Sequence, residues 1–287
     1  MLKSKILGIL LIFFVSLSVF GCGLSTIPSE PLKELHFNTF SAEKSHQVLL
    51  SPASSKYLTV LRKEYSLDDL VSEAADEREK MLAISHWVHS LWEHDGNNAP
   101  DQSDPLSILR DVEEGASYRC VEYAIVIAGC LNALDIPTRV VSLRTEDVET
   151  RASGAGHVVC EAYLKESEKW VMIDGQWDVI PYLEGTPLNA VELQNALRTH
   201  PDKVELATLS SNHKERYKNW ISEYLFYFQV RLDQRYTNDK TTDQSLMLVP
   251  IGAPVPTVFQ KIHPIENTIA TSHVDSFYQP PLVVENP

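Results

Sequence analysis

The chain has 287 residues, a formal net charge of -14 and 44% hydrophobic residues. This length and composition fit a folded chain with one large core, or with a core and an added lobe. The strong negative charge argues against a nucleic-acid-binding protein, because such proteins need basic surface to neutralise phosphates.

The N-terminal residues predict export from the cytoplasm. Two lysines within the first five residues precede an apolar run over residues 6–20, and Cys22 follows it. This is the layout of a secretory signal peptide, and the run is shorter than the ~20 residues that a spanning helix needs. Residues 19–22 resemble a bacterial lipobox, so we expect residues 1–21 to be a lipoprotein signal peptide and Cys22 to be lipidated. An ordinary signal peptide cleaved nearby is the alternative.

These features predict a protein of the bacterial cell envelope, anchored by lipid on the periplasmic or extracellular face. The attachment would come from the acyl chains on Cys22, because a chain this acidic is repelled by anionic lipids. Residues 22–56 are polar with scattered prolines. We interpret them as the lipidated N-terminus and a tether that leads into the folded domain.

The first long helix is predicted over residues 67–94, opened by Ser66 with Asp69 three residues later, as in a capping box. Its apolar residues recur at helical spacing and form one core-facing stripe. His86 and His89 flank this stripe, and we interpret both as solvated or hydrogen-bonded histidines. The sequence contains no C-x-x-C pair and no H-E-x-x-H frame, so we expect no metal site and no cofactor.

A helix followed by closely spaced strands predicts an α+β domain. A short helix is expected over residues 104–113, and the apolar run from residue 120 to residue 134 predicts a buried helix. Strands are expected over residues 136–143, 157–164 and 169–173. Cys130 and Cys160 fall within these elements and are interpreted as buried free thiols, with a disulfide between them as the alternative.

The remaining third of the chain is predicted to contain two helices and an extended segment. The helices are expected over residues 187–199 and 213–232, and residues 246–259 are interpreted as an edge strand or an extended covering segment. Aromatic residues such as Trp220 and Tyr224 recur at helical spacing in the second helix. We expect them to pack in the core, with an aromatic platform for glycans as the alternative.

Three residues of this pattern could form a catalytic site. Cys120 begins a predicted helix, His157 begins a predicted strand, and Asp174 ends the next one. If these two strands pair with Leu164 opposite Lys169, position 159 lies opposite 174 and shares a face with His157, because side chains alternate along a strand. This register would bring the carboxylate to the imidazole.

A thiol, an imidazole and a carboxylate together supply a nucleophile, its base and the group that orients the base. Cysteine attacks as the thiolate, and the unpaired N–H groups at the start of a helix favour an anion there. The residue types and their order therefore predict a thiol enzyme that uses Cys120, His157 and Asp174.

The stretch from Cys120 to about Asp178 resembles the core of the transglutaminase-like superfamily. The resemblance lies in the cysteine segment, in residues 134–141, in residues 156–159 and in residues 170–174. It implies a papain-like α+β core in which the cysteine starts a helix packed on an antiparallel sheet that carries the histidine and aspartate. We assign residues 57–185 to this core and residues 186–287 to a C-terminal helical and extended addition packed on it.

A second hydrogen-bond donor for the oxyanion is also needed, beside the backbone N–H of the nucleophile. Papain-like enzymes place a glutamine six residues before the cysteine, and this chain has Glu114 there, which cannot donate when ionised. The candidates that remain open are Trp92, Asn97, Asn98 and Gln102.

The expected reaction is amide-bond chemistry on a peptide or protein substrate, through an acyl-enzyme on Cys120. Hydrolysis by a peptidase or amidase is favoured, because water is always present whereas transamidation needs a site that excludes it. Transglutaminase activity is the first alternative, and a non-catalytic binding module is the second. Acetyl transfer is less favoured, because the Arg-Gly-Gly-x-Cys run of arylamine N-acetyltransferases is absent. We expect a monomer.

Overall fold

The computed structural model describes residues 32–39, 46–210 and 214–284. These belong to one compact unit that starts at residue 32. The predicted signal peptide and lipidation site at Cys22 lie outside the described residues. Within those residues no helix combines the length and the apolar character that crossing a membrane requires.

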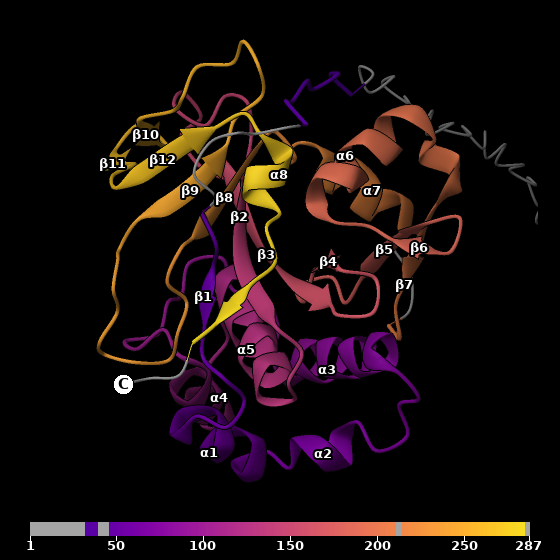
Figure 1. Ribbon diagram of the computed structural model, residues 1–287, viewed down its shortest axis with the longest axis vertical. Coiled ribbons are helices and arrows are strands. Elements are labelled where there is room, and N and C mark those ends of the chain that lie inside the picture. Colours follow the sequence, from indigo (N-terminus) through magenta and orange to yellow (C-terminus); the bar gives the residue numbers. More distant parts are fainter. Residues whose placement is uncertain (1–31, 40–45, 211–213, 285–287) are drawn as a thin grey trace, which may run out of the picture. The chain divides into compact units, whose positions relative to one another are not determined.

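A six-stranded sheet runs through the middle of this unit (Figure 1). Its strand order is β12-β9-β8-β2-β3-β4, and all neighbours are antiparallel except the parallel pair of β12 and β9. The strands of the sheet are β2 (Thr138–Arg144), β3 (Gly156–Leu164), β4 (Lys169–Ile173), β8 (Tyr227–Arg231), β9 (Ser245–Leu248) and β12 (Thr268–Thr271).

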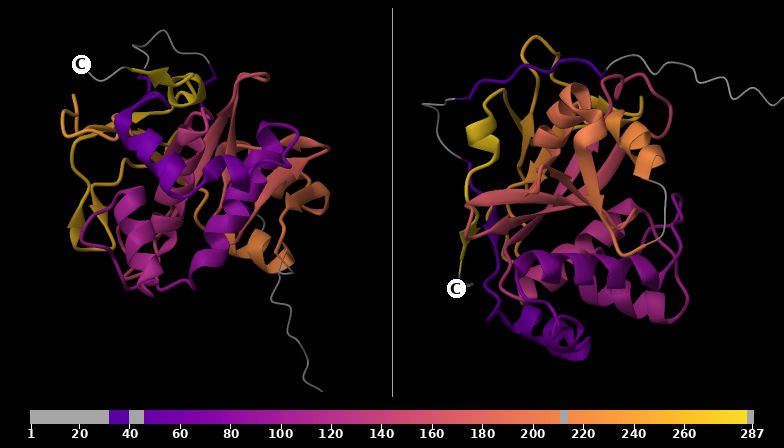
Figure 2. Two further views of the ribbon diagram at one scale, coloured as in Figure 1. Left: turned by 90° about the horizontal axis from the view of Figure 1, so that it is seen from below. Right: turned by 90° about the vertical axis from the view of Figure 1, so that its right-hand side faces the viewer.

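Helices cover both faces of this sheet. Helices α1 to α5 contribute to one core with the side chains of Cys160 and Ala162, whereas α6 and α7 pack on the opposite face with Val141 and Val159. Figure 2 shows the sheet between these two helical layers. The helices are α1 (Lys56–Glu64), α2 (Leu67–Leu70), α3 (Glu77–Leu91), α4 (Pro105–Glu113), α5 (Cys120–Ala133), α6 (Ala190–Thr199), α7 (Lys214–Ser222) and α8 (Val274–Phe277).

Three smaller sheets complete the described fold. The first has the order β6-β5-β7, and the other two are the pairs β1-β13 and β10-β11. Their strands are β1 (Leu49–Leu50), β5 (Ile180–Leu183), β6 (Thr186–Pro187), β7 (Val204–Ala207), β10 (Val258–Phe259), β11 (His263–Pro264) and β13 (Leu282–Val283), and one 3-10 turn lies at Pro201–Lys203. Strand β1 falls in the segment predicted to be a tether, and Leu50 is buried there.

The elements predicted between residues 104 and 199 are confirmed. Helix α4 is capped by Asp104, whose side chain accepts hydrogen bonds from two backbone N–H groups of the first turn. Helix α5 begins at Cys120, and β2, β3, β4 and α6 follow where they were expected. Cys130 and Cys160 are free and buried, as predicted.

The prediction of one helix over residues 67–94 is wrong. Ser66 has a left-handed backbone (φ 47) and makes no capping bond, and α2 ends after one turn. The longer helix α3 starts at Glu77 instead, where the Asp76 side chain accepts a hydrogen bond from the N–H of Glu79. A well-formed aspartate cap therefore decides where the helix begins.

The prediction of one helix over residues 213–232 is also wrong. Helix α7 ends at Ser222, and the aromatic run after it becomes β8, between β2 and β9. Phe226, just before this strand, and Tyr227 and Phe228, at its start, are all buried. Strand β9 likewise lies inside the sheet rather than at its edge. The C-terminal part of the chain thus supplies half of the central sheet.

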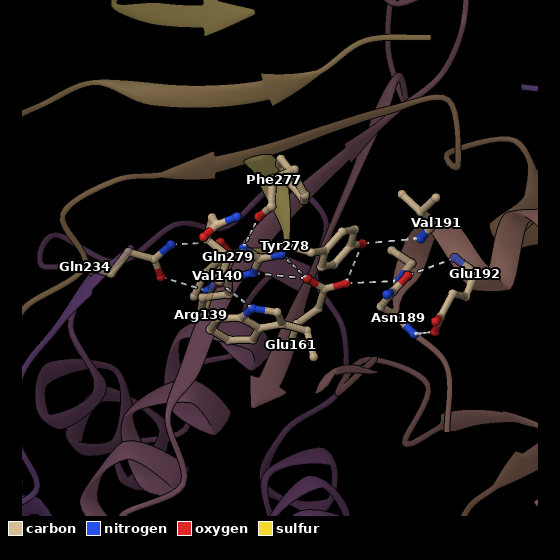
Figure 3. A network of polar contacts seen from close by, with 12 residues as sticks. Arg139, Val140, Glu161, Asn189, Val191, Glu192, Gln234, Phe277, Tyr278 and Gln279 are labelled. Carbon is tan, nitrogen blue, oxygen red and sulfur yellow. Dashed lines mark hydrogen bonds and ion pairs between the residues drawn. The ribbon is translucent and has the colours of Figure 1, made fainter. Parts of the chain in front are cut away.

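A buried ion pair fastens the C-terminal segment to the sheet (Figure 3). Arg139 on β2 donates to Glu161 on β3 at 2.7 Å, and neither side chain is exposed. The same guanidinium donates to the carbonyl of Phe277 at 2.8 Å, and the Tyr278 hydroxyl donates to Glu161 at 3.1 Å. The ring of Trp170 lies 4.2 Å from the guanidinium carbon. The sheet and the segment around α8 are therefore held by one polar network.

Candidate active site

Cys120 is the first residue of α5 and is partly exposed. The turn that presents it is fixed by Glu122, whose buried carboxylate accepts from the backbone N–H of Arg119 at 3.1 Å and from its guanidinium at 2.7 Å. The Tyr123 hydroxyl also donates to the carbonyl of Trp92 at 2.8 Å. The thiol thus lies at a rigid helix N-terminus, where backbone N–H groups favour a negative charge.

His157 and Asp174 are joined by a 2.7 Å contact between Nε2 and Oδ2, and both side chains are almost fully buried. The pairing of β3 with β4 places Leu164 opposite Lys169 and Cys160 opposite Ile173. This is the predicted register, and it brings the carboxylate at the end of β4 to the face that carries the imidazole. The predicted strand pairing is confirmed.

A tight turn holds Asp174 in this position. Its backbone pairs with Val179 in both directions, at 2.9 Å and 3.1 Å, and its second carboxylate oxygen accepts from the N–H of Trp177 at 3.3 Å. Gly175 follows directly and lies against α5, because a Cβ there would be 2.3 Å from a methyl carbon of Ile127. The absence of a side chain at Gly175 therefore lets the aspartate turn pack closely on the helix of Cys120.

The Cys120 thiol also interacts with His157, because it is among the groups that raise the pKa of the imidazole. Because Nε2 of the His157 ring contacts Asp174, Nδ1 is the ring nitrogen that can face the Cys120 sulfur. Burial alone would lower the pKa of His157, but the charge and hydrogen bond of Asp174, together with the contact to Cys120, outweigh burial and raise the pKa to about 10. The imidazole is therefore protonated at neutral pH, and a protonated imidazole favours a neighbouring thiolate.

Aromatic side chains from α7 and the turn after it cover the histidine. The ring of Trp220 meets the ring of His157 edge-on, with 4.7 Å between centroids, and the Tyr224 ring lies at 5.8 Å. Trp177 packs on Trp220 at 5.1 Å. The sequence predicted Trp220 and Tyr224 as core residues and did not connect them to the site, although their spacing of four already placed them on one face. They pack around the imidazole and shield it from water.

His94 is a second residue near the site that the sequence did not single out. Its pKa is lowered, first by burial and then by the positive charge of His157. His94 follows α3 and precedes the loop that leads to α4, so only the folded chain places it beside β3.

The four candidate oxyanion donors differ in their exposure and in the hydrogen bonds that their side chains make. Asn97, Asn98 and Gln102 are exposed. The Asn98 amide donates to the carbonyl of Ser117 at 2.8 Å, and the Gln102 carbonyl accepts from Ser107. The Trp92 indole is buried, its Nε1–H has no partner among the described residues, and its ring stacks on Tyr123 with 4.2 Å between centroids. Of the four, Trp92 alone presents a buried, unused donor.

The histidines of α3 are hydrogen-bonded, as predicted. His86 meets Asp178 at 2.9 Å, and His89 meets the carbonyl of Gly175 at 3.1 Å. Across the described ranges, no three histidine, cysteine, aspartate or glutamate residues lie close enough together to hold a metal ion.

Residues 66–175 match the family model of the transglutaminase-like superfamily. This region of the chain is similar to the transglutaminase-like core. The matched region includes Cys120, His157 and Asp174, and it ends in the turn that positions the aspartate. The α+β architecture predicted from the resemblance is confirmed. Among curated protein sequences, none matches the chain.

Solved structures similar to the transglutaminase-like core are distant. A candidate cysteine protease from Cytophaga hutchinsonii is 15% identical with a TM-score of 0.35, and the match covers 55% of each chain. LapG from Legionella pneumophila is 14% identical with a TM-score of 0.32, over 61% of this chain and 95% of LapG. A red sea bream transglutaminase is 12% identical with a TM-score of 0.34, over 72% of this chain and 37% of that one. The chain thus spans about half of the Cytophaga protein and about a third of the transglutaminase.

Proposed function

We propose that this protein is a thiol enzyme that cleaves amide bonds through an acyl-enzyme on Cys120. The observation that carries the proposal is the chain of contacts from the Cys120 thiol to His157 and from His157 Nε2 to Asp174 at 2.7 Å. A buried imidazole held protonated between a thiol and a carboxylate is suited to nucleophilic catalysis.

In the proposed reaction, the thiolate of Cys120 attacks the carbonyl carbon of the amide and forms a tetrahedral intermediate. His157 gives its proton to the nitrogen of the leaving amine as the C–N bond breaks, which leaves a thioester on the sulfur. Neutral His157 then takes a proton from water, the resulting hydroxide attacks the thioester, and the carboxylic acid leaves as the thiolate of Cys120 and the protonated His157 are restored. Asp174 keeps the imidazole oriented and stabilises its charge in both steps.

The oxyanion of both tetrahedral intermediates requires hydrogen-bond donors aimed at it. We propose the backbone N–H of Cys120 as the first donor and the Trp92 indole as the second. The support is that the indole N–H is buried and unpaired, and that Trp92 stacks on Tyr123, one turn into the helix that Cys120 begins.

We favour hydrolysis over transamidation, so the proposed activity is that of a peptidase or amidase. Mass spectrometry of a glutamine-containing peptide, incubated with and without a primary amine, distinguishes the two reactions. Hydrolysis yields the cleaved or deamidated peptide in both samples, whereas preferential formation of the amine adduct would make the enzyme a transglutaminase. Cys120→Ala should abolish either product, and Cys130→Ala, which alters a buried thiol outside the site, should retain it. If neither product forms with a panel of peptides, the binding-module alternative is favoured.

We further propose that the enzyme acts in the bacterial cell envelope, held there by lipid on Cys22. The support is the basic start, the short apolar run and the lipobox-like residues 19–22. In cells, Cys22→Ala should move the protein from the membrane fraction to the soluble fraction, whereas Cys160→Ala should not. A Cys22→Ala protein that stays in the membrane fraction would contradict lipid anchoring at this residue.

A further inference from the structure

One half of the central sheet is not fully covered by helices. A cavity of about 780 Å³ lies there, lined by residues of β2, β3, β8 and α5 and by the loop of residues 233–240. Figure 1 shows these three strands side by side in the middle of the sheet, with α5 below them. A volume of this size is typical of pockets for small ligands.

The burial pattern of β2 marks the open face. Val140, Ser142 and Arg144 are partly exposed and line the cavity, whereas Val141 and Leu143 between them are completely buried. On β3 and α5, the partly exposed residues Val158, Val121 and Ile125 also line the cavity. The cavity therefore has an apolar wall made of aliphatic side chains that the fold leaves uncovered.

Arg144 lies in this wall without a negatively charged partner among the described residues. Its only side-chain hydrogen bond there runs to the carbonyl of Gln229, which is itself held by Thr268, and its Nε–H is buried and unpaired. Phe259 stacks at 5.0 Å from the guanidinium carbon. Burial lowers the pKa of Arg144 to about 10, which still leaves it charged at neutral pH. A partly desolvated guanidinium without a counter-charge is costly, and an anion in the cavity would supply that charge.

The charges around the cavity oppose those of the whole chain. Four cationic and two acidic residues line it, although the formal net charge of the chain is -14. Both acids are already engaged. Asp233 pairs with Arg235 at 2.6 Å, and Asp104 caps α4 and accepts from Tyr57. After the Asp233–Arg235 pair, the lining keeps the positive charges of Arg144, Arg231 and Lys240 against the single negative charge of Asp104, so its formal net charge is +2.

We propose that this cavity binds an organic carboxylate with an apolar body, and that the Arg144 guanidinium pairs with this carboxylate. The aliphatic wall would contact the body of the ligand. The planar guanidinium matches a carboxylate in geometry, and a charge-assisted hydrogen bond is among the stronger ones that a protein makes. The ligand is a small free acid or the carboxylate of a peptide. Val158 directly follows His157 on β3, and neighbouring strand residues point to opposite faces, so the cavity lies on the face of β3 opposite to the His157 side chain. The binding does not depend on catalysis.

The test is a titration of the full-length chain, observed through the Arg Nε–H signals in ¹⁵N NMR spectra. N-acetyl-leucine should shift the Arg144 signal saturably, and N-acetyl-leucinamide, which lacks the carboxylate, should not. Acetyl-alanyl-alanyl-leucine, added to the Cys120→Ala chain so that it is not consumed, tests the peptide source. Tighter binding of this peptide identifies a peptide carboxylate, and tighter binding of N-acetyl-leucine identifies a small acid.

Arg144→Gln should weaken carboxylate binding about tenfold to a hundredfold, as expected for loss of a charged hydrogen bond. Arg144→Lys keeps the charge without the planar donor and should give an intermediate loss. Arg110→Gln, which removes an exposed arginine paired with Glu64, should leave binding unchanged. Equal binding of the amide, equal binding of inorganic phosphate, no saturable shift with either acid, or unchanged affinity in a folded Arg144→Gln chain would each overturn the proposal.

Discussion

Asp174 holds His157 in its protonated state, so Asp174→Asn is the most direct test of the proposed role of this carboxylate. The two side chains are isosteric, and asparagine preserves the tight turn while it removes the negative charge that faces His157 at 2.7 Å. Burial would then dominate, and the pKa of His157 should fall below its ordinary value instead of lying near 10. The imidazole would be neutral at physiological pH, and the neighbouring thiolate would lose its counter-charge.

The size of the effect on His157 follows from the pKa shift and from the burial of the His157–Asp174 pair. A rise in the pKa of His157 from 6.5 to about 10 corresponds to on the order of 5 kcal/mol, at about 1.36 kcal/mol per pKa unit. Both side chains are almost fully buried, so solvent screens little of this interaction. We expect Asp174→Asn to lower kcat/KM by at least about a hundredfold, since the base is then held in the wrong protonation state.

The assay is an NMR titration of the His157 ring in the wild type and in Asp174→Asn, together with turnover of a peptide amide. The matched control is Asp178→Asn, because Asp178 is also buried and also bonds a histidine, His86 at 2.9 Å, in the same turn region. The control should leave the titration of His157 unchanged. If His157 titrates alike in the wild type and in Asp174→Asn, the proposed role of the carboxylate is wrong.

Three further predictions concern stability. Glu161→Ala leaves the Arg139 guanidinium buried without its carboxylate and should lower the free energy of unfolding by about 3–5 kcal/mol, as measured in denaturant. Glu184→Ala, the control, breaks an exposed pair with Lys203 and should change the denaturant midpoint little. Gly175→Ala should cost about 1–3 kcal/mol and reduce turnover, since its Cβ would collide with α5 beside Asp174. The pKa of His157 is raised in the folded state. Protonated His157 therefore makes its full contribution to the free energy of unfolding below about pH 6.5, and this contribution is lost as the pH rises through about 10. Between about pH 7 and 10 the free energy of unfolding should therefore fall more steeply in the wild type than in His157→Gln.

The position of the candidate site was predictable because it rests on local rules. A short turn between β3 and β4 fixes their register, and alternation of side chains then decides which residue faces His157. Cys120 follows a glycine-containing loop and opens a long apolar run, which is a recognisable helix start. These features need no knowledge of distant contacts.

The wrongly predicted elements are those for which the sequence fits two different structures. Residues 224–228 are all buried, and a continuous apolar run fits a helix covered on several sides as well as a central strand. At residues 66–76, two possible caps lie close together in sequence, and the geometry of Asp76 prevails over that of Ser66. Trp220 packs on His157, and Arg144 has an unpaired Nε–H. Both features depend on tertiary contacts, so the sequence alone could not reveal them.

The most direct test of a Cys120 thiolate activated by His157 is alkylation by iodoacetamide as a function of pH. The buried thiol of Cys130 serves as an internal reference, since burial raises its pKa far above the ordinary value. The account predicts that, at about pH 6, Cys120 reacts at least about tenfold faster in the wild type than in His157→Ala, while Cys130 stays unmodified. A Cys120 as inert as Cys130, or one that reacts equally fast without His157, would contradict it.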